Sequence, residues 1–241
     1  MGLPYNKNYL VITKQQVILV WSAKAACTTV NHMFFDHESL LDIALQYSHW
    51  IHHYRSKYQL EQDAIIKKSI KSIPCNRYIQ FCVNPYRRAV SSYIHGMSRR
   101  YLPEKDKNIS FHDFLRRLHA GQIQPNPHHN LQTFYKNDYR LITTVKMEYI
   151  NEELEKINTK LNLHFKPCKN LNIKRKSNKI DYFVGNDKWE TCKDNIPNDY
   201  TLFYNDNIKL LVEKIYYKDI KNLGYTWDMF VTYESSKKIS N

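Results

Sequence analysis

Short apolar runs alternate with longer amphipathic stretches along this chain. The apolar runs at 9–13, 17–21, 78–83 and 140–145 are bounded by polar or turn residues, so they predict buried strands. Apolar residues at helical spacing predict helices at 38–54, 61–73, 86–97, 110–118, 151–161 and 205–223, the last ended by Gly224. Because strands alternate with helices, we expect an α/β fold with a central, mostly parallel sheet flanked by helices.

The length and charge of the chain bound its organisation and its partners. A chain of 241 residues without an internal repeat or a linker predicts one domain, 1–241. The formal net charge is +13, which favours an anionic partner but does not choose among nucleic acid, a nucleotide, an acidic glycan and a membrane surface. The basic residues are dispersed, so we expect no specific nucleic acid.

Cysteine usage and hydropathy indicate the compartment. The five cysteines are odd in number and widely spaced, without a C-x-x-C pair, which fits neither a disulfide scaffold nor a zinc site. We find no signal peptide and no apolar run near the roughly 20 residues needed to span a bilayer. We therefore expect a cytoplasmic protein without a membrane span. The oligomeric state is left open.

The most informative segment follows the apolar run Val17–Trp21. It reads Ser22-Ala-Lys-Ala-Ala-Cys-Thr-Thr29 and leads into a helical pattern, which predicts a strand, a tight loop and a helix N-terminus. Unsatisfied backbone N–H groups at such a terminus, with Lys24 beside them, form a ready anion site. The loop departs from the Walker A pattern, because no glycine flanks Lys24. An ATP- or GTP-hydrolysing loop is therefore not expected, although the topology is P-loop-like, with three layers.

A second candidate loop follows the apolar run 78–83. It places Arg87, Arg88, Ser91 and Ser92 on the first turns of a helix. Ligands of open α/β sheets bind at the carboxyl ends of the strands. Two anion sites at two strand ends suit a nucleotide that is phosphorylated at both ends of its ribose.

These residues resemble a known family. The segment 22–29 looks like the 5′-phosphosulfate loop of sulfotransferases that use 3′-phosphoadenosine 5′-phosphosulfate, in particular the carbohydrate sulfotransferases, whose pattern is P-K-x-[AG]-[CS]-[TS]. The segment Phe81–Tyr93 is similar to the 3′-phosphate segment of that family, F-V-R-[DN]-P-[FY]-x-R-L-V-S-x-Y. His128-His-Asn-Leu-Gln132 is similar to a weaker H-x-x-P-Q element. The resemblance covers roughly Val17 to Tyr225.

The resemblance implies one sulfotransferase-like domain, the sulfate donor as co-substrate and no metal. It assigns cofactor binding to Lys24, Ala25, Ala26, Cys27, Thr28, Thr29, Asn84, Arg88, Ser91, Arg175 and Ser177. It assigns contacts with the acceptor, a hydroxyl compound expected to be a glycan, to His128 and Gln132. Val83 stands where the family has an arginine that binds the 3′-phosphate. Arg87, Arg88 and Arg175 are the candidates to compensate.

Sulfuryl transfer needs in-line geometry, stabilisation of the leaving phosphate and a base for the acceptor hydroxyl. Lys24 with Thr28 and Thr29 would stabilise charge on the phosphate. Histidine is the usual base near neutral pH. The candidates are His37, His49, His52 and His53; we favour His52, which follows Ile51 as in the apolar-His element of the family, and place His53 second.

Other interpretations stay open at this point. Each histidine can be a packing or surface residue, Arg88 and Ser91 can brace their helix, and His128 can order its loop. A nucleotide kinase would need a glycine-containing loop and an aspartate for magnesium, and neither is found. A basic nucleotide- or nucleic-acid-binding protein and a catalytically degenerate glycan-binding relative are the alternative functions.

Overall fold

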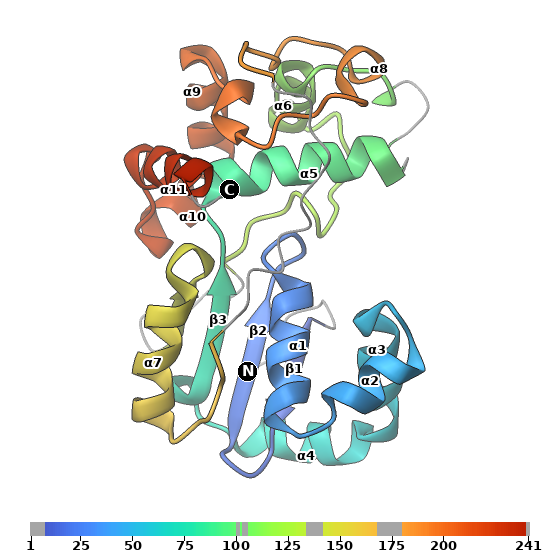
Figure 1. Ribbon diagram of the computed structural model, residues 1–241, viewed down its shortest axis with the longest axis vertical. Helices are drawn as coiled ribbons and strands as arrows, with labels where there is room; N and C mark the ends of the chain where they lie inside the picture. Colours follow the sequence, from blue (N-terminus) through green and yellow to red (C-terminus); the bar gives the residue numbers. More distant parts are fainter. Residues whose placement is uncertain (1–7, 100–101, 103–105, 134–141, 168–179, 240–241) are drawn as a thin grey trace. The chain divides into compact units, whose positions relative to one another are not determined.

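The computed structural model describes residues 8–99, 102, 106–133, 142–167 and 180–239 (Figure 1). The chain divides into two compact units, and each combines two stretches of sequence. Unit 1 comprises 1–83 and 134–172, and unit 2 comprises 84–133 and 173–241. Each unit has its own hydrophobic core. The single domain expected from the sequence stays a prediction.

Unit 1 is built on a four-stranded sheet. The strands are β1 (Tyr9–Ile12), β2 (Val17–Trp21), β3 (Tyr78–Cys82) and β4 (Thr143–Lys146), in the order β1-β2-β3-β4. β1 pairs antiparallel with β2, whereas β2 with β3 and β3 with β4 pair in parallel. The α/β class and the mostly parallel sheet predicted from the alternation of strands and helices are thus confirmed.

Helices cover both faces of this sheet. Because successive side chains of a strand point to opposite faces, Leu19 and Trp21 lie in one core cluster and Ile18 and Val20 in another. The first cluster is shared with α1 (Cys27–His37), α3 (Ile51–Glu61) and α7 (Ile150–Leu161), and the second with α4 (Asp63–Ser72). Figure 1 shows α1 and α7 beside the strands. Unit 1 therefore has three layers.

The helix predicted over 38–54 is interrupted. The structure has α2 (Leu41–Tyr47) and then α3, with an extended backbone at Ser48 between them. The Ser48 hydroxyl accepts a hydrogen bond from the Trp50 backbone N–H at 3.2 Å. Serine side chains that bond nearby backbone groups compete with helical bonds, which explains the break.

Unit 2 is helical in its described part. It contains α5 (Pro85–Arg99), α6 (Phe111–His119), α8 (Trp189–Cys192), α9 (Asp206–Ile215), α10 (Tyr217–Leu223) and α11 (Trp227–Ile239). Short 3₁₀ turns lie at 75–77 and 147–149 in unit 1 and at 200–203 in unit 2. Ser110 caps α6, since its hydroxyl accepts from the Asp113 N–H at 3.0 Å.

The C-terminal helix predicted over 205–223 is two helices, because the chain turns at Tyr216 between α9 and α10. Gly224 does end the second, at φ 62°. The sequence analysis missed α11. Within the described ranges, no helix combines the length and the apolar character that crossing a membrane requires.

Candidate anion-binding site

The loop after β2 has a strained backbone. Trp21 ends the strand, and the Ala25 N–H donates to the Ser22 carbonyl at 3.1 Å to close a turn. Lys24 and Ala26 have φ angles of 64° and 56°, in the left-handed region that non-glycine residues avoid. Such residues cost on the order of 1–3 kcal/mol each and cluster at functional sites.

The loop leads directly into the N-terminus of α1. Ala26 stands at the N-cap, and no side chain caps the helix there. The first-turn N–H groups at Cys27, Thr28 and Thr29 point out of the helix end, where the helix dipole is positive. Lys24 is half-buried beside them in sequence, and Ala25 is buried. The predicted strand, loop and helix N-terminus are confirmed as local structure, whereas the anion stays a prediction.

The structure brings His52 to this loop. Its Nε2 lies 3.3 Å from the Thr28 Oγ1, although the two residues are 24 positions apart in the chain. The fully buried Asn31 approaches the other ring nitrogen, with its Nδ2 3.5 Å from the His52 Nδ1, and also donates to the Cys27 carbonyl at 2.5 Å. α1 therefore contacts both ring nitrogens of His52, which lies on α3.

The Asn31 contact bears on the position of the ring proton. An Asn31 Nδ2 that donates to the His52 Nδ1 favours the tautomer with its proton on Nε2, facing Thr28. In this tautomer His52 is a donor toward the loop. The role of base at Nε2 requires the other tautomer.

The surroundings of His52 keep the imidazole neutral. Burial, followed by the charge of Arg55 and then by His32 and His53, lowers the pKa of His52 from 6.5 to about 4. Burial and the positive charges nearby both disfavour the protonated, positively charged form of the His52 ring. An anion bound beside the ring would oppose this effect and raise the pKa.

His53, the second candidate base, does not reach the loop. Its ring is exposed, lies 3.1 Å from the Ser48 hydroxyl through Nδ1 and packs edge-on against Trp50. His49 is exposed as well. His37 packs against Phe165 at the far end of α1. Of the four histidines considered, His52 is the one placed at the loop.

The predicted 3′-phosphate residues of unit 2 already have partners within that unit. The Asn84 Oδ1 accepts from the Tyr86 N–H at 3.1 Å, at the start of α5, and its Nδ2 donates to the Thr226 carbonyl at 3.2 Å. Arg88 is 1% exposed and donates to the carbonyls of Asn130 at 2.6 Å and Pro127 at 3.2 Å. Arg88 therefore braces the 124–133 loop, and Ser91 is half-buried.

Arg87, Arg88 and Arg175 are the candidates to supply the positive charge that Val83 lacks. Arg87 pairs with the buried Glu234 and lies over the rings of Tyr200 and Tyr233, at 5.2 and 5.1 Å. Arg87 and Arg88 are thus both engaged within unit 2. Arg175 and Ser177 lie outside the described residues.

The predicted acceptor residues belong to the 124–133 loop. The His128 Nδ1 lies 2.7 Å from the Asn126 Oδ1, and its ring packs on His95 at 4.4 Å between centroids. Gln132 is fully buried, and its backbone N–H donates to Asp219 at 2.7 Å. These contacts order the loop, so a buried Gln132 side chain meets an acceptor only if the loop moves.

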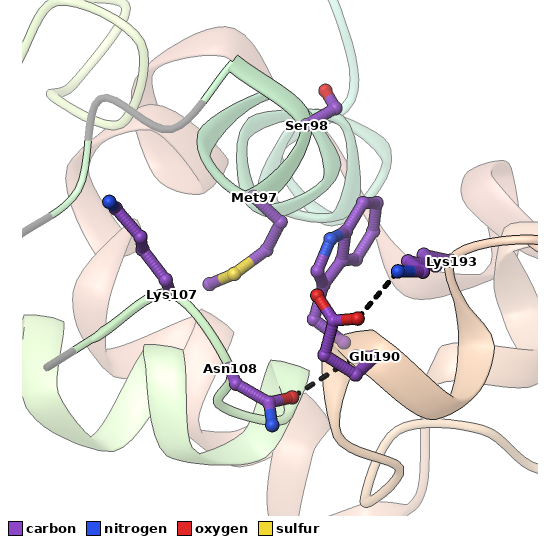
Figure 2. A pocket seen from close by; sticks show the side chains of 7 residues that line it. Met97, Ser98, Lys107, Asn108, Glu190 and Lys193 are labelled. Carbon is purple, nitrogen blue, oxygen red and sulfur yellow. Dashed lines mark hydrogen bonds and ion pairs between the residues drawn. The ribbon is translucent and has the colours of Figure 1, made fainter. Parts of the chain in front are cut away.

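A separate hollow of about 460 Å³ in unit 2 holds none of the predicted site residues. Its walls come from the end of α5, residues 107–108 and α8. Figure 2 shows Met97 pointing into it, with Glu190 and Lys193 paired at 2.5 Å on its other side. Glu190 neutralises Lys193 there, while Lys107 adds one further positive charge to the lining.

Two residues at the loop after β2 were missed by the sequence analysis, Asn31 and Arg55. Neither belongs to a motif, but each lies one helical turn from a residue that was singled out, Asn31 from Thr28 and Arg55 from His52. Spacings of three place side chains on one helix face, and this signal could have found them. Among the residues described, no three His, Cys, Asp or Glu side chains gather as a metal site would require.

Comparison of the chain with protein-family models, with curated proteins and with solved structures gave no match, so the site is interpreted from its own residues and geometry.

Proposed function

We propose that the protein is a sulfotransferase that moves a sulfuryl group from 3′-phosphoadenosine 5′-phosphosulfate to a hydroxyl of a carbohydrate acceptor. One observation carries the proposal. The favoured base, His52, lies 3.3 Å from Thr28 of the predicted phosphosulfate loop. The two were singled out from separate segments, for different reasons, and meet within one unit.

Different residues of unit 1 take the separate roles that an in-line transfer requires. His52 takes the proton of the acceptor hydroxyl, and the acceptor oxygen attacks the sulfur. The bond between sulfur and the bridging phosphate oxygen breaks, and the leaving 3′-phosphoadenosine 5′-phosphate keeps the electron pair. Lys24, the Thr28 and Thr29 hydroxyls and the N–H groups of the helix stabilise the developing negative charge.

The remaining assignments are proposed on the resemblance. Asn84, Arg88, Ser91, Arg175 and Ser177 would meet the 3′-phosphate, and His128 and Gln132 the acceptor. In its described hydrogen bonds Arg88 donates to backbone carbonyls, and the side chain of Val83 is uncharged. We therefore expect recognition of the donor to depend chiefly on its 5′ end, at the loop of unit 1.

Calorimetric titration with 3′-phosphoadenosine 5′-phosphate tests the loop assignment. We expect the wild type to bind and Lys24→Ala to lose at least tenfold in affinity, because a charge-assisted contact with the phosphate disappears. Lys57→Ala, an exposed lysine of α3, is the matched control and should bind within twofold of the wild type. A wild type that does not bind this nucleotide contradicts the proposal.

The base is tested separately, by mass-spectrometric detection of sulfated oligosaccharide. We expect His52→Ala to reduce transfer at least a hundredfold while nucleotide binding is kept, since general-base catalysis contributes typically 10²–10⁴. His49→Ala, an exposed neighbour, should transfer like the wild type. Unchanged turnover in His52→Ala would remove His52 from the mechanism.

The second candidate function is that of a catalytically degenerate relative of the sulfotransferases, which binds a glycan without transferring sulfate to it. It is favoured by Val83 in place of the family arginine and by the carbonyl partners of Arg88. Binding of acidic oligosaccharides without sulfated product, in the presence of the donor, would support this function over the first.

A further inference from the structure

Arg55 is a cation at the loop after β2 without a carboxylate partner in the part of the chain that the structure describes. It lies on α3, three residues after His52. Its Nη1 donates to the Asn8 Oδ1 at 3.3 Å, and its guanidinium lies 5.8 Å from the centre of the Trp21 ring. No carboxylate within the described ranges forms an ion pair with it. A half-buried guanidinium without an acidic partner is unusual, because charges taken from water are normally paired.

Two buried donors at this place have no hydrogen-bond partner among the described residues. They are the Arg55 Nε–H and the indole Nε1–H of Trp21, whose side chain is fully buried. Unsatisfied buried polar atoms are rare in native proteins, and an absent ligand is one of their causes. The Asn31 Oδ1, a buried acceptor at the same loop, also has no partner among the described residues. The two donors and the positive charge favour an acceptor that carries negative charge.

The position of Arg55 ties these donors to the loop. Trp21 is the last residue of β2, directly before the loop, and its backbone N–H donates to the Asn8 carbonyl at 3.2 Å. Arg55 therefore contacts the two chain segments at the carboxyl end of β2. It also lies near enough to His52 for its charge to lower the pKa of that imidazole, and His52 touches Thr28.

We propose that Arg55 binds the tetrahedral oxyanion held by the loop 22–29, as a second cationic contact beside Lys24. The planar guanidinium offers several N–H donors in a fixed fork that suits sulfate and phosphate oxygens. Identifying this oxyanion as the sulfuryl or 5′-phosphate group of the sulfate donor rests on the proposed function. The oxyanion site itself rests on Arg55, Trp21 and the loop.

Anion binding at Arg55 should also change the pKa of His52. The groups that face its ring are Arg55 and His53 on α3 and His32, Thr28 and Asn31 on α1. A bound oxyanion neutralises Arg55, so the pKa of His52 should rise on binding. Arg55 would thus bind the anion and, through its charge, adjust the imidazole beside it.

The binding experiment uses the full chain with three probes: sodium sulfate, inorganic phosphate and 3′-phosphoadenosine 5′-phosphate. We expect Arg55→Ala to weaken nucleotide binding at least tenfold in calorimetry and Arg55→Lys to restore part of the loss, because lysine keeps the charge without the fork. Lys57→Ala, on the same helix and paired with Glu61, should stay within twofold of the wild type. Thermal unfolding of each variant checks that it is folded.

A second measurement needs no variant. Titration of the His52 ring by NMR, with and without sulfate, should show a pKa at least one unit higher with the anion. If Arg55→Ala does not fold, the inference is tested by this titration of the wild type and by the affinity of Arg55→Lys for the nucleotide. An unchanged pKa together with wild-type affinity in Arg55→Lys would overturn the inference.

The outcomes separate the inference from the proposed function. Nucleotide binding that is equal in the wild type and Arg55→Ala overturns the inference and leaves the function intact. Sulfate or phosphate binding that depends on Arg55, without nucleotide binding, supports the inference and refutes the function. A wild type that binds none of the three probes overturns both.

Discussion

Lys24 and Ala26 hold the left-handed backbone conformation in the loop between β2 and α1, at φ 64° and 56°. A side chain in this region brings Cβ close to the carbonyl oxygen, at a cost of roughly 1–2 kcal/mol. The packed strand before the loop and the helix after it impose the conformation. The two left-handed residues turn the chain from β2 into α1, so Lys24 directly precedes the helix N-terminus in the chain.

Paired glycine substitutions test this strain. Ala26→Gly should raise the free energy of unfolding by about 0.5–1 kcal/mol, because glycine adopts positive φ without the Cβ clash. The same substitution next door, Ala25→Gly, should lower it by about 1 kcal/mol, because Ala25 is fully buried and has no positive φ. Urea unfolding measures both, and equal signs would argue against strain at Ala26.

The 124–133 loop illustrates how one connecting segment of unit 2 is fixed from several elements. Arg88 and Ser92 of α5 donate to its carbonyls. Tyr216, between α9 and α10, donates to the His129 carbonyl at 3.0 Å. The fully buried Asp219 of α10 accepts from the Gln132 and Thr133 N–H groups, at 2.7 and 2.9 Å. A loop anchored in this way holds one conformation without regular structure.

Removing the Asp219 charge should loosen this loop. In Asp219→Asn an amide NH₂ faces backbone donors, so we expect unit 2 to lose about 2–3 kcal/mol of unfolding free energy. Asp206→Asn, at an exposed position in the first turn of α9, should cost less than about 1 kcal/mol. Hydrogen exchange at Gln132 and Thr133 should accelerate in the first variant only. Unchanged protection there would refute the anchoring role.

Stability of the whole chain should depend on pH through four buried or half-buried histidines. Burial is the largest cause that lowers the pKa of His32, His37, His52 and His129 below 6.5. Between 6.5 and the lowered folded pKa, the unfolded chain binds more protons than the folded one, so stability falls as the pH falls. The pKa of Glu38 is raised by burial and acts in the opposite direction.

Unfolding in urea at pH 7 and pH 5 measures this dependence. His52, with a pKa near 4, should account for roughly 1–2 kcal/mol of the loss at pH 5, after allowance for its partial exposure. His52→Gln should therefore lose less stability than the wild type between the two pH values. Equal losses in the two proteins would show that His52 is not protonated on unfolding in this range.

The sequence analysis predicted elements better than it predicted their interruptions. All four described strands lie where apolar runs predicted them, because a short continuous apolar run bounded by turn residues is typical of a buried strand. The breaks at Ser48 and Tyr216 were missed, since each depends on a local bond or a turn that apolar spacing does not report. No linker in the sequence marks the two compact units, because each combines two separate stretches of the chain.

The loop after β2 and the histidine segment were recognisable from residue order alone, because their patterns are local: a strand, a lysine and a helix start in one case, an apolar-His pair in the other. Only the fold showed that the histidine in contact with Thr28 is His52, rather than His53 or His49. Only the fold showed, too, that Asn31 and Arg55 lie at the same place. Such contacts depend on how α1 and α3 pack on the sheet, and packing brings together residues that no spacing in the chain relates.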